Sequence, residues 1–367
     1  MRWDVFCRVI DNYGDAGVCW RLARQLVAEH GIAVTLWIDR LATLARFAPL
    51  LDPALAQQSD SGVIVRDLDD RAASEPADVI IEGFGCGLPP RYVDAMAART
   101  PAPLWINLEY LSAEPWVDTV HAIASPHPRL ALPRYFWFPG FTPNAGGLLR
   151  EAGLFEARDA YQSAMARRAA GDPLRIVLFT YPNRALPALF DAWSESDDAI
   201  ACAVPEGVAA AALDQWLRGD VPHAGQSVTR GHVTLDMMPF TTQDAFDRLL
   251  WRSDVNFVRG EDSFVRAQWA ARPFVWQPYP QEARAHRLKL DAFLARYADA
   301  LPAPTSAAVE TFWRAFNDED GVAAVDAWPA FRDALAPLAA HGRGWAAHLA
   351  TLPELGSSLV RFARDRL

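Results

Sequence analysis

The sequence predicts a protein of the α/β class with two domains of similar size. The chain has 367 residues, which is too many for a single hydrophobic core. Short apolar runs alternate with helical segments, a pattern typical of βαβ units and parallel sheets. The pattern breaks at Gly171-Asp172-Pro173 and starts again at Leu174. Two such domains are expected to form a cleft and to bind ligands at the carboxyl ends of their strands.

The first domain is expected to alternate strands with helices from its start. Its predicted strands lie at residues 3–10, 32–38, 62–65, 78–82 and 104–108. After the first strand, Val18, Leu22 and Leu26 fall on one helical face. Residues 113–147 are rich in proline and aromatic residues and have weak periodicity. They predict an irregular surface at the edge of this domain.

The second domain is expected to repeat the alternation after a helix at 148–170. Its predicted strands lie at residues 174–179, 199–204, 233–237, 255–258 and 274–276, and its predicted helices at 246–251, 263–271 and 283–297. The chain ends in an amphipathic segment, residues 357–367, with Ser357 or Ser358 as the expected N-cap. Its apolar face predicts that Leu359 and Phe362 pack on the first domain.

Composition excludes several classes of protein. Hydrophobic residues make up 51% and charged residues 22%, which excludes a disordered chain. The net charge of −10 argues against direct binding of nucleic acid. The four cysteines are scattered without a C-x-x-C pair, so a reducing, cytoplasmic location is expected, with no zinc cage. Neither a signal peptide nor a membrane span is predicted.

The first candidate motif follows the first predicted strand and precedes a helix. It reads Asp11-Asn12-Tyr13-Gly14-Asp15-Ala16-Gly17 and lacks the glycine spacing of a dinucleotide site. Its two carboxylates would repel a phosphate, and they suit a cationic substrate or one that loses a proton. The alternative is structural: Asp15 caps the helix and Asp11 only ends the strand. The spacing leaves both interpretations open.

The second motif, Arg259-Gly260-Glu261-Asp262-Ser263, also lies between a predicted strand and a helix. Asp262 or Ser263 is an expected N-cap, and a helix N-terminus binds phosphate through its N–H groups. Arg259 would add a bidentate contact, and the acidic pair suits sugar hydroxyls, so a nucleotide-sugar fits this motif. An ordinary capped helix with a surface ion pair is the alternative.

Strand ends supply further candidates. Phe179 and Tyr181 end one predicted strand, and Phe240 and Gln243 follow another. These aromatic rings could stack on a base, and Gln243 could read its edge, although such rings are more often core. Several weaker signals stay undecided: Asp67-Leu68-Asp69, which matches a metal–diphosphate motif, the strand-end carboxylates Glu82 and Glu109, and Lys289, the only lysine, with His286 three residues before it.

Four long segments together resemble one family. They are WDVFCRVIDNYGDAGVCWRLARQL (3–26), WINLEYLSAEPWV (105–117), FWFPGFTPNAGGLLRE (136–151) and SDVNFVRGEDSFVRAQWAARPFVWQPYPQ (253–281). They are similar to the protein-arginine rhamnosyltransferases that modify bacterial elongation factor P, nearly from end to end. The resemblance implies the GT-B fold, with two Rossmann-like domains around a cleft. The implied domains are residues 1–170, to which helix 357–367 crosses back, and residues 171–356.

The resemblance also implies an activity. The family moves L-rhamnose from dTDP-β-L-rhamnose to one arginine of elongation factor P, with inversion and without a metal or other cofactor. The product relieves ribosome stalling at polyproline. Two alternatives stay open: a nucleotide-sugar enzyme with a small acceptor, or an epimerase, and a non-catalytic protein that binds a translation factor.

Roles for single residues follow from the same resemblance. Asp15 corresponds to the general base, and Asp11 lies nearby. The residues implied to bind the donor are Asn12, Tyr13 and Gly14 under the sugar, Phe179, Tyr181, Phe240 and Gln243 around the nucleotide, and Arg259, Gly260, Asp262 and Ser263 at the diphosphate and sugar. Glu261 is implied in catalysis. Tyr13 is often Phe in the family, a mild departure.

Overall fold

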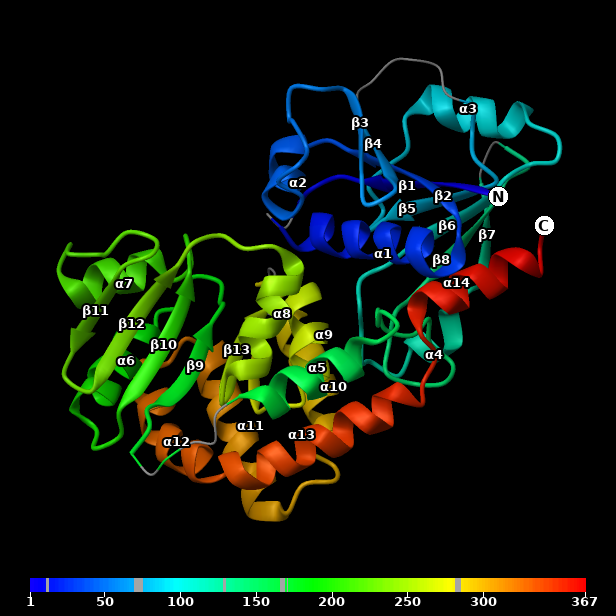
Figure 1. Cartoon of the computed structure of the whole chain (residues 1–367). Coiled ribbons are helices and arrows are strands. Elements are labelled where there is room, and N and C mark those ends of the chain that lie inside the picture. The colour runs from blue at the N-terminus through cyan, green and yellow to red at the C-terminus, as the bar shows by residue number, and fades with distance from the viewer. Residues whose placement is uncertain (11–12, 69–74, 128–129, 166–168, 170, 281–284) are drawn as a thin grey trace. The chain divides into compact units, whose positions relative to one another are not determined.

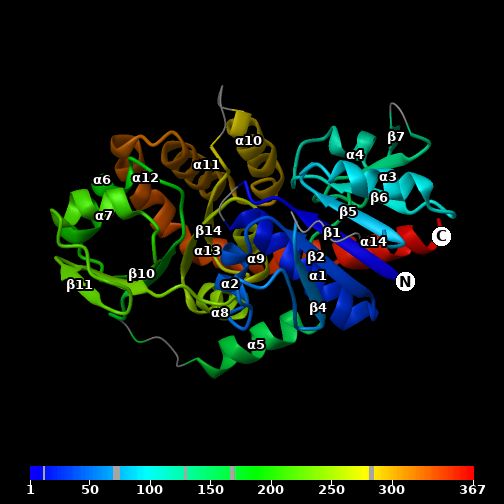
Figure 2. The same ribbon diagram turned by 90° about the horizontal axis from the view of Figure 1, so that it is seen from above.

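The computed structural model divides the chain into two compact units (Figures 1 and 2). It describes residues 1–10, 13–68, 75–127, 130–165, 169, 171–280 and 285–367. Unit 1 consists of Met1–Ala152 with Leu349–Leu367, and unit 2 of Gly153–His348. The expected α/β class is confirmed in both units.

Unit 1 contains a twisted sheet with helices on both faces. Its elements are β1 (Arg2–Cys7), α1 (Gly14–His30), β2 (Ala33–Ile38), α2 (Leu41–Phe47), β3 (Gln57–Asp60), β4 (Val63–Asp67), β5 (Val79–Gly83), α3 (Pro90–Ala98), β6 (Leu104–Leu108), α4 (Val117–Val120), β7 (Ala124–Pro126), β8 (Pro133–Trp137) and α14 (Leu355–Arg364). The strand order is β3-β4-β2-β1-β5-β6-β8-β7, with β3 and β7 antiparallel at the two edges. The parallel strands β1, β5 and β6 therefore lie side by side.

Two cores form on the two faces of this sheet. On one face, α1 and α14 pack over alternate strand residues such as Val5 and Ile106. On the other face, α3 places Tyr92 and Met96 against Phe6. Figure 1 shows α1 and α3 on opposite sides of the strands. Both faces of the inner strands are buried, which explains their nearly continuous apolar runs.

The C-terminal helix α14 completes the first core. Leu359 and Phe362 are buried there, and the Phe362 ring lies 5.0 Å from the ring of Trp137 on β8. The expected serine cap is wrong. Helix α14 begins at Leu355, and the carboxylate of Glu354 accepts from the N–H groups of Gly356 and Ser357. A carboxylate before the first turn satisfies two amides and suits the helix dipole.

The proline-rich stretch at 113–147 is more regular than its sequence suggests. It contributes β8, which pairs in parallel with β6 and extends the main sheet. Proline stands only at the first residue of β8, where it leaves the ladder intact.

Unit 2 repeats the architecture with more helices. Its elements are α5 (Leu154–Ala164), β9 (Leu174–Leu178), α6 (Leu186–Glu195), β10 (Ile200–Pro205), α7 (Ala210–Leu217), β11 (Ser227–Arg230), β12 (Val233–Met238), α8 (Gln243–Arg252), β13 (Val255–Arg259), α9 (Asp262–Trp269), β14 (Phe274–Gln277), α10 (Ala285–Tyr297), α11 (Ala303–Asn317), α12 (Gly321–Asp333) and α13 (Leu335–Ala350). The strand order is β11-β12-β10-β9-β13-β14, and β9 and β13 are neighbours.

The helices of unit 2 also cover both faces of its sheet. Phe257 of β13 packs against Trp193 of α6 and Phe312 of α11. On the opposite face, Trp276 of β14 stacks on Phe264 of α9 at 3.9 Å between ring centroids. Helices α11 to α13 were not predicted from the sequence.

The boundary between the units lies earlier than the expected residue 170. Helix α5 belongs to unit 2, where Phe155 packs edge-on against Trp269. Gln162 donates to the backbone carbonyls of Trp251 and Ala270. These contacts make α5 part of the second core, so the break at Gly171 is a loop within unit 2.

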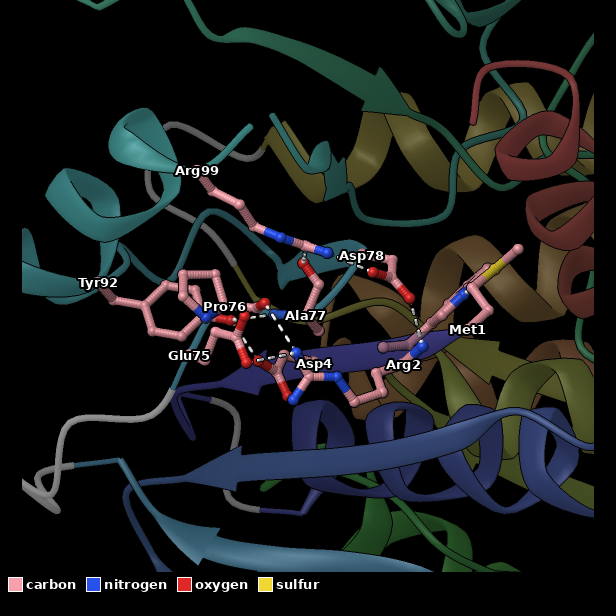
Figure 3. Close-up of polar contacts among 10 residues, drawn as sticks. Met1, Arg2, Asp4, Glu75, Pro76, Ala77, Asp78, Tyr92 and Arg99 are labelled. Carbon is pink, nitrogen blue, oxygen red and sulfur yellow. Dashed lines mark hydrogen bonds and ion pairs between the residues drawn. The ribbon is translucent and has the colours of Figure 1, made fainter. Parts of the chain in front are cut away.

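A polar network closes the amino end of the sheet in unit 1 (Figure 3). Arg99 reaches Asp78 at 2.5 Å, and the same carboxylate accepts from the N–H of Arg2. Tyr92 donates a short hydrogen bond to the buried carboxylate of Asp4. This end is opposite to the strand ends that carry the predicted site residues.

Candidate functional site

In unit 2, Arg259 is the centre of the predicted donor site. It ends β13, and its Nη1 donates to the carbonyl of Thr180 at 2.8 Å. The guanidinium carbon lies 4.5 Å from the ring centroid of Phe179 and 4.9 Å from that of Tyr181. The neighbouring strands β9 and β13 thus bring together three residues predicted from separate motifs. A cation held against two rings keeps its position before any ligand arrives.

The turn after β13 leads directly into helix α9. Gly260 has φ +61°, and its N–H donates to the carbonyl of Gln277 while its own carbonyl accepts from Trp276 Nε1. The expected serine or aspartate cap is wrong. Helix α9 begins at Asp262 with Glu261 as N-cap, and the Glu261 side chain makes no capping bond.

Ser263 has a different role from the one expected. Its hydroxyl donates to the carbonyl of Arg259 at 2.5 Å and accepts from the Arg259 N–H at 3.1 Å. The side chain therefore clamps the turn instead of capping the helix. Because the first turn of α9 points its N–H groups toward this turn, the arrangement suits an anion such as a diphosphate.

The predicted nucleotide residues lie at two places in unit 2. Tyr181 is 5% exposed, and its N–H donates to Gln277 Oε1 at 2.9 Å. Gln243 is the first residue of α8 and is buried, whereas Phe240 is half-buried in the preceding loop. The ring of Phe179 lies 5.0 Å from that of Phe246 on α8. This contact brings the start of α8 to the end of β9.

In unit 1, Asp15 stands in the first turn of α1. Its side chain is 2% exposed, and Oδ2 accepts from the N–H of Ile10 at 2.8 Å. Tyr13 precedes the helix and packs edge-on against Phe47, and Gly14 is its first residue. Helix α1 therefore fixes Asp15 just beyond the carboxyl end of β1. Asp11 and Asn12 lie outside the described residues.

The end of β6, two strands away from β1, leads into Glu109, which the sequence left undecided. Asn107 of β6 donates a short hydrogen bond to Glu109 Oε1, and Tyr110 stacks on Phe84 at 4.6 Å. The sequence pointed to Glu109 because this carboxylate directly follows a predicted buried strand. Nothing in the spacing marked Asn107, because an asparagine inside an apolar run looks like an ordinary strand residue.

Glu82 lies in a separate cavity of unit 1. The cavity has a volume of about 360 Å³ and is lined by Glu82, Gly87, Leu88, Val93, Trp105, Ser125, Pro126, His127 and Arg134. The Glu82 carboxylate accepts from Trp105 Nε1 and from Arg134, so its charge is already balanced. None of the residues predicted for the donor or the base lines this cavity.

Two further features bear on the expectations. No cluster of three His, Cys, Asp or Glu side chains suited to a metal occurs within the described ranges. Of the Asp67-Leu68-Asp69 motif, Asp67 ends β4 and Asp69 falls outside those ranges. No helix in the described parts of the chain is both long and apolar enough to cross a membrane.

Comparison with known proteins decides the family. The family model described as Elongation-Factor P (EF-P) rhamnosyltransferase EarP matches residues 3–364. The chain belongs to the EarP family. The resemblance expected from the sequence is therefore confirmed, and it covers both units.

Relatives of the EarP family match over their full length. A protein-arginine rhamnosyltransferase of Pseudomonas putida is 48% identical over 376 residues, covering 100% of this chain and 99% of the relative. One from Pseudomonas aeruginosa is 44% identical, covering 100% and 99%. A solved structure described as the structural basis for EarP-mediated arginine glycosylation of translation elongation factor EF-P is 36% identical with a TM-score of 0.69, covering 100% and 99%.

More distant structures bear on the fold alone. An α-glucosyltransferase in complex with UDP and a 13-mer DNA is 8% identical to this chain, with a TM-score of 0.53. The match covers 100% of this chain and 99% of the glucosyltransferase chain. The fold is that of the GT-B glycosyltransferases, as the resemblance to the family implied.

Proposed function

We propose that this protein transfers L-rhamnose from dTDP-β-L-rhamnose to an arginine side chain of EF-P in the cytoplasm, with inversion and without a metal ion. Membership of the EarP family and relatives named protein-arginine rhamnosyltransferase support the reaction class. The contacts of Arg259 with Thr180 and Phe179, directly before helix α9, are the observation that carries the donor assignment. The product would help the ribosome to translate polyproline.

The acceptor half of the reaction needs a carboxylate. An arginine guanidinium is protonated at neutral pH and is a poor nucleophile until a proton leaves. In the proposed step, one guanidinium nitrogen attacks C1 of the sugar while its proton passes to the Asp15 carboxylate. Helix α1 and the Ile10 N–H hold this carboxylate in place. Asp11 is proposed to orient the guanidinium.

The donor half of the reaction needs positive charge at the leaving group. As the nitrogen–C1 bond forms, the bond from C1 to the phosphate oxygen breaks, and dTDP leaves with the electron pair. Arg259 and the first-turn amides of α9 stabilise the charge on this oxygen, which allows the reaction without a metal. Glu261 and Asp262 are proposed to contact the sugar, which carries oxocarbenium character at the transition state.

The nucleotide is proposed to lie where unit 2 gathers its strand ends. Phe179, Tyr181 and Phe240 supply ring surfaces for the thymine base, and Gln243 supplies an amide for its edge. Tyr13 and Gly14 are proposed to lie under the sugar together with Asn12.

Intact mass spectrometry of EF-P tests the proposal. EF-P incubated with this protein and dTDP-β-L-rhamnose should gain the mass of one deoxyhexose, and an EF-P variant with its acceptor arginine changed to lysine should gain none. The rate should be the same with and without EDTA. Transfer to the lysine variant, or a requirement for an added divalent metal, would contradict the corresponding part of the proposal.

A further inference from the structure

Asn107 and Glu109 form a buried polar pair at the carboxyl end of β6. Asn107 is 1% exposed and donates through Nδ2 to Glu109 Oε1. Asn107 Oδ1 is also buried, and it has no hydrogen-bond partner among the residues that the structure describes. A buried amide oxygen without a hydrogen bond lowers the stability of the folded chain, so we expect a ligand to donate a hydrogen bond here. Asn107 Oδ1 faces Gly85, where a Cβ atom would stand 3.9 Å away.

Two stacked aromatic rings, Phe84 and Tyr110, come from the segments next to this pair. The Phe84 ring lies nearly parallel to that of Tyr110, with an interplanar angle of 19°. Phe84 has φ +56°, which is unusual for a residue with a side chain, and its N–H is tied to the carbonyl of Leu108 at 2.6 Å. Strain of this kind concentrates at functional sites. Aromatic rings are the surfaces on which a guanidinium stacks.

The loop after β5 is rich in glycine. Strand β5 separates β1 from β6 and ends in Gly83-Phe84-Gly85-Cys86-Gly87. In this loop the Phe84 ring turns to Tyr110, and the Cys86 thiol turns back to the carbonyl of Phe6. A Cβ atom at Gly87 would meet nothing within 4 Å, and one at Gly85 would touch only Asn107 Oδ1, so these two positions of the loop add no side chain next to Asn107.

The strands that lead to these two carboxylates are spaced at about the span of a guanidinium with its two acceptors. Phe6, Glu82 and Asn107 are in register across β1, β5 and β6. The ends of β1 and β6 are therefore two strand spacings apart, roughly 9–10 Å. A guanidinium that donates to one carboxylate on each side spans roughly 8 Å from oxygen to oxygen. Asp15 lies in the first turn of the helix that follows β1, and Glu109 directly follows β6, so both carboxylates belong to the carboxyl edge of this sheet.

We propose that Glu109 and Tyr110 form the subsite for the acceptor guanidinium. This assignment rests on the proposed function and names the residues that recognise its acceptor. Glu109 accepts from the guanidinium nitrogens that do not react, Tyr110 stacks on its plane, and Asn107 positions the Glu109 carboxylate. Asp15 is then left to take the proton from the attacking nitrogen. Lysine, with one ammonium, cannot contact both carboxylates in this way.

Steady-state kinetics of three variants test the subsite. Glu109→Gln should raise KM for EF-P about tenfold or more, as expected for loss of a charge-assisted hydrogen bond, with dTDP affinity unchanged. Tyr110→Leu should raise the same KM, and Tyr110→Phe should restore it because the ring is retained. Asn107→Ala should give a smaller rise in KM than Glu109→Gln. Circular dichroism confirms that each variant is folded.

Glu114→Gln is the matched control. Glu114 lies five residues further along and accepts from the Ser112 hydroxyl, so its loss should leave KM unchanged. Unchanged KM and kcat in folded Glu109→Gln would overturn the subsite while wild-type transfer still supports the proposed function. Equal KM values for Tyr110→Leu and Tyr110→Phe would overturn the role of the ring. Failure of the wild-type protein to modify EF-P would instead overturn the function itself.

Discussion

Asp247 and Arg266 join helix α8 to helix α9 through two parallel hydrogen bonds inside unit 2. Arg266 Nε lies 2.9 Å from Asp247 Oδ1, and Nη2 lies 2.6 Å from Oδ2. Both side chains are almost fully buried. Helix α8 begins with Gln243, and α9 follows Glu261, so this ion pair fixes the two helix starts that carry candidate donor residues.

Breaking this ion pair should destabilise the protein strongly. Asp247→Ala leaves the Arg266 charge buried without its carboxylate, and removal of one partner of such a pair costs about 3–5 kcal/mol. Urea unfolding followed by circular dichroism measures the change. Arg332→Ala is the control, because Arg332 pairs with Asp198 and Asp333 on the surface and such pairs contribute about 1 kcal/mol or less. Similar losses for the two variants would contradict the assignment.

The polar network at the amino ends of the strands in unit 1 should make the free energy of unfolding depend on pH. Burial alone would raise the pKa of Asp78, but the Arg99 guanidinium and the N–H of Arg2 hold the pKa below its ordinary 3.8 (Figure 3). The Asp78 carboxylate therefore binds a proton more readily in the unfolded chain than in the folded one. Its contribution to the free energy of unfolding is present above pH 3.8 and is lost as the pH falls through the lower folded pKa.

Comparison with Asp78→Asn measures that contribution. The difference in unfolding free energy between wild type and this variant should be largest near neutral pH. It should shrink as the pH falls below the ordinary aspartate pKa. A difference that stays constant over this range would show that the Asp78 charge contributes nothing through Arg99.

Arg259 should control nucleotide affinity. Arg259→Ala removes the cation that would meet the diphosphate, and loss of one charged hydrogen bond costs about 1.5–3 kcal/mol. Calorimetry with dTDP should therefore show affinity reduced about 10- to 100-fold. Arg332→Ala again serves as the control and should bind dTDP as wild type does. Wild-type affinity in Arg259→Ala would remove Arg259 from the donor site.

Much of the fold was predictable from the sequence because runs of apolar residues between turn residues specify most of the inner strands. The strands around Val5, Ile106 and Phe257 are apolar runs bounded by glycine, proline or polar residues. The structure places those around Ile106 and Phe257 within one residue of the expected limits, whereas the strand around Val5 ends at Cys7, three residues before the expected Ile10. Strand β8 was missed because prolines and alternating aromatics hide its period. Its place in the sheet comes from pairing with β6, which no local pattern encodes.

The candidate site was predictable only in part. Arg259 and Ser263 stand out in sequence because polar residues follow a buried strand. The expectation that Ser263 caps a helix was wrong because α9 begins at Asp262 and the Ser263 hydroxyl bonds to the backbone of Arg259, a competition common for serine. The contact of Arg259 with Thr180, 79 residues away, and the link from Asn107 to Glu109 depend on the folded chain.

The Asp15→Asn variant tests the central claim most directly. Asparagine keeps an oxygen for the Ile10 N–H, so helix α1 and dTDP binding should be intact, but it cannot take the proton from the guanidinium. Loss of a general base typically lowers rates about 10²- to 10⁴-fold. Single-turnover transfer of rhamnose to EF-P, at saturating donor and acceptor, should fall by that factor. Transfer at a near wild-type rate would show that Asp15 is not the base, and Glu261 or Asp11 would have to fill that role.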